Sequence, residues 1–496
     1  MNLGHGNWYR AAICTALCLS AFFGQQPVQA KSLIALEPCR IADADGLSST
    51  EARCGKFSVP EDPDDPKGAR IELAVAVVPA VATKAKPDPL FLIAGGPGQG
   101  SIEGYAPILG AFGGIHRERD LVLVDQRGTG GSNRLDCDMP DDALEGGEIA
   151  PAELRALAGQ CLAALHTRPQ FYTTSIAVRD LDAVRAALGY AQINVLGGSY
   201  GTRVAQHYAR RYPGQTRTVI LDGVVPPGLA LVPGIAIESQ RALDRVFARC
   251  AADKDCNLHF PKLAAQFAKL DATLRKGPIP VSLADPVTGV SRRIEVTRAH
   301  LVTMARMLTY SPWTASLLPL VVHEAATNGN YAPLAAQAEM VSDDLERVIA
   351  MGMHNSVVCA EDEPLFDGAV DRKTLEATAI GPLMQDGMKA ICEVWPRGPV
   401  DADFAKPLDS KVPALLLSGE FDPATPPSYG AIAAKGFANG LHLVVPGQGH
   451  GQTSLPCVQR ILRQFIDAGT AGNLDTSCVA RIRPAPFFLS FSGSAP

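Results

Sequence analysis

The sequence lacks a strong net charge, an internal repeat and an apolar run long enough to span a membrane. Its 45 lysines and arginines against 51 aspartates and glutamates give a formal net charge of −6. That balance provides no electrostatic case for binding nucleic acid or an anionic membrane surface. The 496 residues are 47% hydrophobic and 19% charged, a composition typical of a globular protein with a sizeable core. The length suffices for one core domain that carries an insertion.

The first 30 residues have the pattern of a secretory signal peptide. Arg10 precedes an apolar run over residues 11–23, and residues 28–30 form a small-residue cleavage site. The run is shorter than the roughly 20 residues that a transmembrane helix needs. We therefore predict cleavage after Ala30 and export by a bacterium, to the periplasm or the medium, of a mature chain without a membrane partner.

Ten cysteines remain after that cleavage, and none has the C-x-x-C spacing of a redox or zinc site. An even number of cysteines in an exported chain favours disulfides. The sequence does not fix their connectivity, so pairing of neighbours is a hypothesis from proximity, and buried free thiols are the alternative. The neighbouring pairs are Cys39 with Cys54, Cys137 with Cys161, Cys250 with Cys256, Cys359 with Cys392, and Cys457 with Cys478.

The most informative motif is Gly-Gly-Ser-Tyr-Gly at residues 197–201. A short apolar stretch at 193–196 predicts a buried strand before it, and residues 202–212 predict a helix after it. A strand, a Gly-x-Ser-x-Gly turn and a helix form the nucleophile elbow of an α/β-hydrolase. The pattern predicts that Ser199 is a catalytic nucleophile at the carboxyl end of a sheet.

A glycine-rich loop at residues 94–100 follows another buried strand, predicted at 90–93. Such a loop at a strand end can turn its backbone N–H groups toward a ligand, although a flexible surface loop has the same composition. We interpret it as one half of an oxyanion hole, in which the N–H groups of Gly96 and Tyr200 bind the oxyanion.

A third buried strand, predicted at 121–124, ends in Asp-Gln-Arg-Gly-Thr-Gly-Gly-Ser at 125–132. Together with Gly-Gly-Pro-Gly at 95–98 and the elbow, this motif resembles the proline iminopeptidase and tripeptidyl aminopeptidase family of α/β-hydrolase serine peptidases. That family usually has histidine before the first glycine, where this chain has Ala94, which puts the hydrogen bonding of that loop in doubt. We expect a structural role for Asp125 and Arg127, through a buried pairing of an arginine with a carboxylate.

The remaining pattern completes a mostly parallel sheet flanked by helices. We predict strands at 55–60, 71–78 and 219–223, helices at 150–165 and 174–188, and only an N-terminal lead over 31–53. After the sixth strand the alternation of strands and helices stops. The resulting domains are a first core part at 31–225, a mainly helical lid at 226–405, and a C-terminal core part, called TAP-like in the family, at 406–496.

Two polar residues of that last part follow two predicted strands. Asp422 comes just after the strand at 414–418, and His450 just after the strand at 441–445. The chain order Ser, Asp, His is that of an α/β-hydrolase triad, so we predict Ser199, Asp422 and His450 as the catalytic residues. Glu420 is the nearby rival for the acid.

The predicted lid holds acidic and aromatic residues with two interpretations each. The resemblance implies that an acid near a lid cysteine holds the substrate's amino group, which points to Glu361 together with Asp362, close to Cys359. The alternative is a solvated acidic turn. Trp313 and Trp395 either line a pocket or pack between lid helices.

These patterns predict an exported serine hydrolase that needs no cofactor or metal. The resemblance implies a peptide substrate with a free N-terminus, from which a single residue, a dipeptide or a tripeptide is released. An esterase or another amide hydrolase is the alternative on the same fold, and a non-catalytic binding protein is a further one. The oligomeric state does not follow from the sequence.

Overall fold

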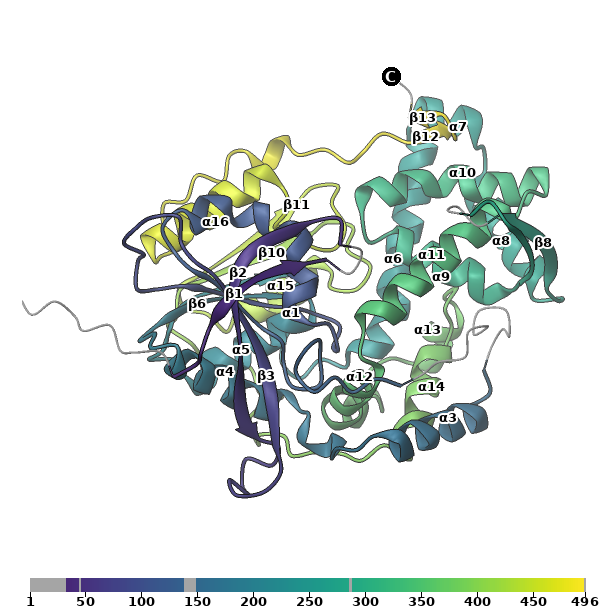
Figure 1. The fold of residues 1–496 in the computed structure, drawn as a ribbon. Helices are drawn as coiled ribbons and strands as arrows, with labels where there is room; N and C mark the ends of the chain where they lie inside the picture. The colour runs from purple at the N-terminus through teal and green to yellow at the C-terminus, as the bar shows by residue number, and fades with distance from the viewer. Residues whose placement is uncertain (1–32, 44–45, 138–148, 285–287, 495–496) are drawn as a thin grey trace, which may run out of the picture.

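The computed structural model describes residues 33–43, 46–137, 149–284 and 288–494. The predicted signal peptide lies outside these ranges. Figure 1 shows two bodies side by side, a sheet with helices on both faces and a largely helical body. The second body consists mainly of the chain between the seventh and tenth strands, which we call the insertion.

A nine-stranded sheet forms the core, in the order β1-β2-β3-β5-β4-β6-β7-β10-β11. The pairs from β1 to β5 are antiparallel, and those from β5 through β4 to β11 are parallel. The strands are β1 (Glu37–Ala42), β2 (Ser49–Pro60), β3 (Arg70–Val78), β4 (Leu90–Ile93), β5 (Leu121–Val124), β6 (Ile193–Gly198), β7 (Thr216–Asp222), β10 (Ala414–Gly419) and β11 (Gly440–Val445). The central parallel strands are short, apolar and buried on both faces, as strands covered by helices on both sides must be.

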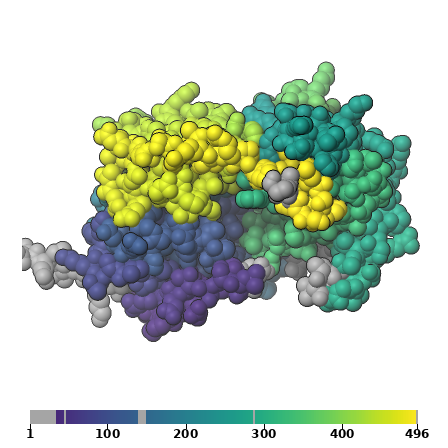
Figure 2. Space-filling view, turned by 90° about the horizontal axis from the view of Figure 1, so that it is seen from above, coloured from purple at the N-terminus to yellow at the C-terminus, as the bar shows by residue number. Residues whose placement is uncertain are grey.

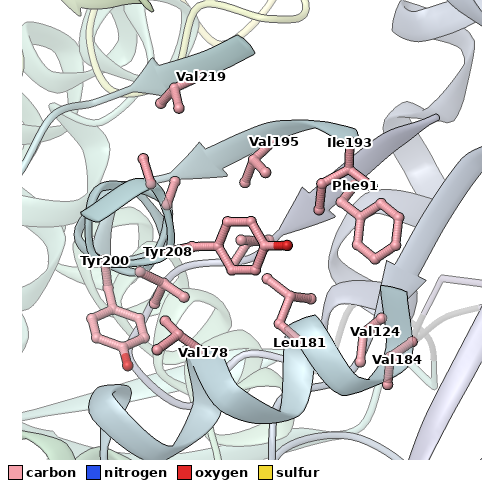
Figure 3. Close-up of a cluster of buried hydrophobic side chains, with 14 of the residues drawn as sticks. Phe91, Val124, Val178, Leu181, Val184, Ile193, Val195, Tyr200, Tyr208 and Val219 are labelled. Atoms are coloured by element: carbon pink, nitrogen blue, oxygen red, sulfur yellow. The ribbon is translucent and has the colours of Figure 1, made fainter. Parts of the chain in front are cut away.

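Helices cover both faces of this sheet. On one face, α4 (Thr174–Ala187) and α5 (Tyr200–Arg211) pack Val178, Leu181 and Tyr208 against Phe91 and Val195 of the central strands (Figure 3). On the other face lie α1 (Ser101–Tyr105), α2 (Gly113–His116) and α16 (Pro456–Ala468). The helix α15 (Pro427–Ala434) joins β10 to β11. These layers are those of an α/β-hydrolase fold.

The prediction that residues 31–53 form only a lead before the first strand is wrong, because β1 and the start of β2 lie within them. Strand β1 pairs antiparallel with β2 at the edge of the sheet, and Cys39–Cys54 links the two strands. Only Ile41 of β1 is buried, so the strand offers no apolar run for the sequence to reveal. The insertion therefore follows the seventh strand of the chain rather than the sixth.

The insertion has its own hydrophobic core and also contains an antiparallel hairpin that the sequence pattern did not predict. Its helices are α6 (Leu231–Ala252), α7 (Lys254–His259), α8 (Leu263–Leu274), α9 (Arg298–Leu308), α10 (Pro312–Asn328), α11 (Ala332–Val348), α12 (Met351–Val357), α13 (Arg372–Glu376) and α14 (Leu383–Cys392), and the hairpin is β8 (Ile279–Ala284) with β9 (Ser291–Val296). None of the helices in the described ranges is long and apolar enough to cross a bilayer.

Two segments from outside the insertion pack against it. The helix α3 (Pro151–Ala164) lies on α14, and the C-terminal hairpin of β12 (Phe488–Ser490) and β13 (Gly493–Ser494) lies on α7 and α10. Phe487 is buried there, with the Arg249 guanidinium 3.9 Å from its ring centroid. In Figure 2 the yellow C-terminal atoms accordingly extend from the core onto the insertion.

All five predicted disulfide pairings are confirmed: Cys39–Cys54, Cys137–Cys161, Cys250–Cys256, Cys359–Cys392 and Cys457–Cys478.

Arg127 forms the expected buried pairing with a carboxylate, and its partner is Asp180 of α4. Its Nε and Nη2 donate to the two carboxylate oxygens at 2.6 and 2.8 Å, and Nη1 donates to backbone carbonyls of Glu61 and Phe171. Asp125 instead accepts backbone N–H groups of Ile102 and Gly131. These contacts tie the loop after β5 to its surroundings.

Arg127→Met should destabilise the fold strongly, because it leaves Asp180 buried without its cation. Removing one partner of a buried pair costs about 3–5 kcal/mol, measured here as the loss of unfolding free energy in urea. Arg179→Met is the matched control, since the ion pairs of Arg179 span 3.8 and 4.0 Å near the surface. Arg127→Met combined with Asp180→Leu should recover most of the loss. If Arg127→Met and Arg179→Met lost the same unfolding free energy, the buried Arg127–Asp180 pair would not be what stabilises the fold.

Candidate active site

Ser199 lies in a strained turn between β6 and α5. Its backbone has φ 53° and ψ −123°, a conformation that residues other than glycine seldom adopt. The turn is tight because α5 begins against the ends of two strands. A side chain on Gly197 would start 2.1 Å from the Gly201 carbonyl oxygen, and one on Gly201 would start 2.5 Å from that of Ile93. The two glycines thus allow the approach that presents Ser199.

Asp422 and His450 follow β10 and β11, which are adjacent and parallel, so their carboxyl ends meet. The distance from His450 Nδ1 to Asp422 Oδ2 is 2.8 Å. Asp422 Oδ1 accepts backbone N–H groups of Ala424 and Thr425, and Thr425 Oγ1 donates to Oδ2. Glu420 accepts the N–H of Gly447 instead, away from the histidine. Asp422 is therefore fixed as the acid that faces His450.

Asp222, at the end of β7, fixes the other side of the His450 loop, and the sequence analysis missed it. Its carboxylate is buried and accepts backbone N–H groups of Gln452 and Thr453 at 2.7–2.9 Å. Gly223 follows with φ +70°, and a side chain there would lie 2.9 Å from His450 Cε1. An acid followed by glycine at a strand end beside the elbow is the local signal that could have revealed this support.

Two carboxylates raise the pKa of His450 above its usual value. Burial lowers the pKa, because it disfavours the charged ring, but the charge of Asp422, its hydrogen bond and the charge of Asp222 outweigh burial. The protonated form of the ring is thus stabilised by its surroundings.

The glycine-rich loop lies against Ser199, since a side chain on Gly95 would be 2.9 Å from Ser199 Cβ. The insertion holds this loop from the other side. Ala350 N–H donates to the Gly98 carbonyl at 3.0 Å, and His354 Nδ1 lies 3.3 Å from the Pro97 carbonyl. This loop, which begins with Ala94, has no histidine of its own, and His354 of the insertion lies beside it.

A cavity of about 830 Å³ lies between core and insertion. Ser199, His450, Gly96 and Tyr200 line it from the core, so the structure brings the predicted nucleophile, base and oxyanion-hole residues to one place. The insertion contributes mainly apolar side chains together with six polar ones. The polar ones are Arg306, Tyr310, Ser342, Glu346, His354 and Asp362, and the apolar ones include Val232, Ile235, Ile349, Met384, Met388 and Ile391. The size suits a small-molecule or short-peptide ligand.

Glu361 and Asp362 lie on a π-helical turn, Val358–Asp362, and are buried, with exposed fractions of 5% and 3%. A solvated turn is therefore wrong for both. Asp362 lines the cavity and accepts from Arg203 Nη1 at 2.7 Å. Glu361 accepts from Thr174 N and Oγ1 at 2.6 and 2.8 Å. Burial raises the pKa of Glu361 to about 7, although Arg203 and Thr174 lower it.

Neither tryptophan lines the cavity. Trp395 is buried and donates to Ser356 Oγ at 3.0 Å, so it packs within the insertion. Trp313 is 66% exposed.

Fold and geometry together define the class of the protein: an α/β-hydrolase with a serine at the nucleophile elbow. Residues 88–305 match the family described as alpha/beta hydrolase fold, and residues 377–478 match the family described as TAP-like protein.

The chain is similar over most of its length to several hydrolases with a named activity. Serine protease Hip1 of Mycobacterium tuberculosis is 27% identical over 89% of this chain and 90% of its own length. Tripeptidyl aminopeptidase of Streptomyces lividans is 26% identical over 88% and 85%, and Carboxylesterase B of Mycobacterium tuberculosis is 28% identical over 80% of each chain. The chain is a hydrolase with the α/β-hydrolase fold, and it is similar over most of its length to a serine protease and to a tripeptidyl aminopeptidase.

If His450 is the base, the acid limb of the kcat/KM profile should have its inflection above pH 6.5, because the enzyme is inactive while His450 is protonated. Asp422→Asn should move the inflection to lower pH and reduce kcat by about 10⁴ at neutral pH. Rates on a neutral ester across pH test this. The matched control is Asp401→Asn, which alters the His207–Asp401 pair outside the cavity. An unmoved inflection in Asp422→Asn would contradict the pairing.

Proposed function

We propose that this chain is an exported serine exopeptidase that releases one to three N-terminal residues from peptides through an acyl-enzyme on Ser199. The observation that carries the proposal is the Asp422–His450 hydrogen bond of 2.8 Å beside the elbow serine, in a cavity that the insertion covers. The names of two relatives, a serine protease and a tripeptidyl aminopeptidase, support a peptide substrate.

In the proposed reaction, Ser199 Oγ attacks the scissile carbonyl while His450 takes its proton. Asp422 orients the ring and stabilises its cation. The backbone N–H groups of Tyr200 and Gly96 bind the oxyanion. The C–N bond then breaks, His450 protonates the leaving amine, and an ester remains on Ser199. Water, activated by His450, hydrolyses this ester and restores the serine.

The insertion, residues 226–405, acts as the lid that makes the enzyme an exopeptidase. An amine drawn into a covered cavity loses its hydration and needs a carboxylate partner. Asp362 lines the cavity, and among the described side chains only Arg203 hydrogen-bonds to it, at Oδ1. We assign the amine to Asp362, while Glu361, which does not line the cavity and accepts from Thr174 instead, holds the turn that carries Asp362.

Export is part of the proposal. Five disulfides, none with the C-x-x-C spacing, are typical of a chain that folds in an oxidising compartment such as the periplasm or the medium.

An esterase is the second candidate, favoured by the largely apolar cavity lining and by the relative named carboxylesterase. Rates on aminoacyl, tripeptidyl and simple ester substrates distinguish the two, because an esterase would cleave esters and leave the amides intact.

Ser199→Ala should abolish turnover, by a factor on the order of 10⁴ or more, and should abolish labelling by a fluorophosphonate, because no nucleophile remains. Ser282→Ala, on the exposed hairpin β8–β9, is the matched control. Equal unfolding free energies for both variants would show that the fold is retained. Turnover by purified Ser199→Ala near the wild-type rate would refute the nucleophile.

Asp362→Asn and Glu361→Gln should each lower kcat/KM for peptides with a free N-terminus relative to the same peptides with an acetylated N-terminus. Truncating the partner of a buried charge costs about 2–5 kcal/mol. The ratio of kcat/KM for the free peptide to kcat/KM for the acetylated one should therefore fall toward one. Product analysis by mass spectrometry gives both the ratio and the length released. Glu363→Gln is the control, because Glu363 pairs with Arg397 nearer the surface. If the ratio is unchanged in both variants, the amine is bound elsewhere.

A further inference from the structure

The cavity also contains an arginine for which the described residues provide no acidic partner. Arg306 of α9 lines it, and its Nη2 donates to Tyr310 Oη at 3.0 Å. Within the described ranges, no carboxylate lies at ion-pair distance from Arg306, and its Nε is buried without a hydrogen-bond partner. Arg203, the other arginine of the cavity, is by contrast paired with Asp362. Arg306 therefore has unused hydrogen-bonding capacity inside the cavity.

Tyr310 fixes Arg306 beside the histidine. The Arg306 guanidinium lies 5.6 Å from the centroid of the Tyr310 ring, and that ring meets the His450 imidazole edge-on with centroids 5.2 Å apart. The backbone makes the same link, because His450 N–H donates to the Tyr310 carbonyl at 2.7 Å. The positive charge of Arg306 accordingly acts on both His450 and His354.

The chemistry of the reaction indicates which part of a substrate meets this charge. A group that protonates the leaving amine stands on the side where the leaving fragment departs. Arg306 is held next to that group, so it faces the leaving fragment rather than the acyl part. A guanidinium matches a carboxylate in shape and can bind it with two parallel hydrogen bonds.

We propose that Arg306 binds a carboxylate on the leaving fragment of the substrate, so that the enzyme favours peptides with a negative charge just beyond the cleaved bond. This inference rests on the proposed peptidase function. The carboxylate has two sources: an acidic side chain at the first residue of the leaving fragment, or the free C-terminus of a short one. The same cavity then offers Asp362 to the amine and Arg306 to the carboxylate of one peptide.

Two pairs of substrates test the proposal. The peptides of the first pair are amidated at the C-terminus and differ only in Glu or Gln after the cleaved bond. Those of the second pair have Gln there and differ only in a free or an amidated C-terminus. We measure kcat/KM for wild type, Arg306→Met, Arg306→Lys and the control Arg293→Met, which removes an exposed arginine of β9 outside the cavity.

Wild type should prefer the charged member of at least one pair by about 10- to 100-fold, the range of a hydrogen bond to a charged group. Arg306→Met should bring that preference close to one, Arg306→Lys should keep part of it, and Arg293→Met should keep all of it. The pair that shows the preference identifies the source of the carboxylate. Because each preference is a ratio within one variant, a partial loss of folded protein does not change it.

Peptides cleaved without any preference in wild type, or with a preference that survives in Arg306→Met, would overturn the proposal and leave the peptidase function standing. If wild type cleaves none of the four peptides while a fluorophosphonate still labels Ser199, the peptidase function itself fails and the proposal fails with it.

Discussion

The close approach of one helix to the ends of two strands is the constraint on which the site depends. Helix α5 begins so near β4 and β6 that the backbone must turn at Ser199 with a positive φ and with a glycine two residues away on either side, Gly197 and Gly201. The same approach places the N-terminus of α5, with its unpaired N–H groups, beside the serine. The strain at Ser199 is tolerated because buried apolar side chains hold α5 to the sheet (Figure 3).

The insertion is part of the site rather than a cover laid over it. It reaches the histidine loop through the Tyr310 carbonyl and the glycine-rich loop through Ala350 N–H. Opposite Tyr310, the buried Asp222 holds the histidine loop from the core. The two loops that face the serine are thus each fixed between core and insertion, so packing changes in the insertion alter the geometry around Ser199.

Local patterns in the sequence were enough to predict the features built from neighbouring residues. The strands before Ser199, Asp422 and His450 are largely apolar runs, each followed within a few residues by one of these side chains, and the disulfides join neighbouring cysteines. The edge strand β1 was missed because it carries no apolar run. The contacts of Asp222, Arg306 and His354 were missed for a different reason: each joins segments far apart in the chain, and no local pattern records which of them meet.

The C-terminal tail has a consequence for how the two bodies move. Besides placing α3 on α14, the chain crosses between core and insertion after β7 and again before β10, and it crosses once more when the tail docks Phe487 and β12 on α7 and α10. A body tethered at several separate places has no single hinge axis about which to swing open. Access to the cavity then depends on small local displacements rather than on a swing of the whole insertion.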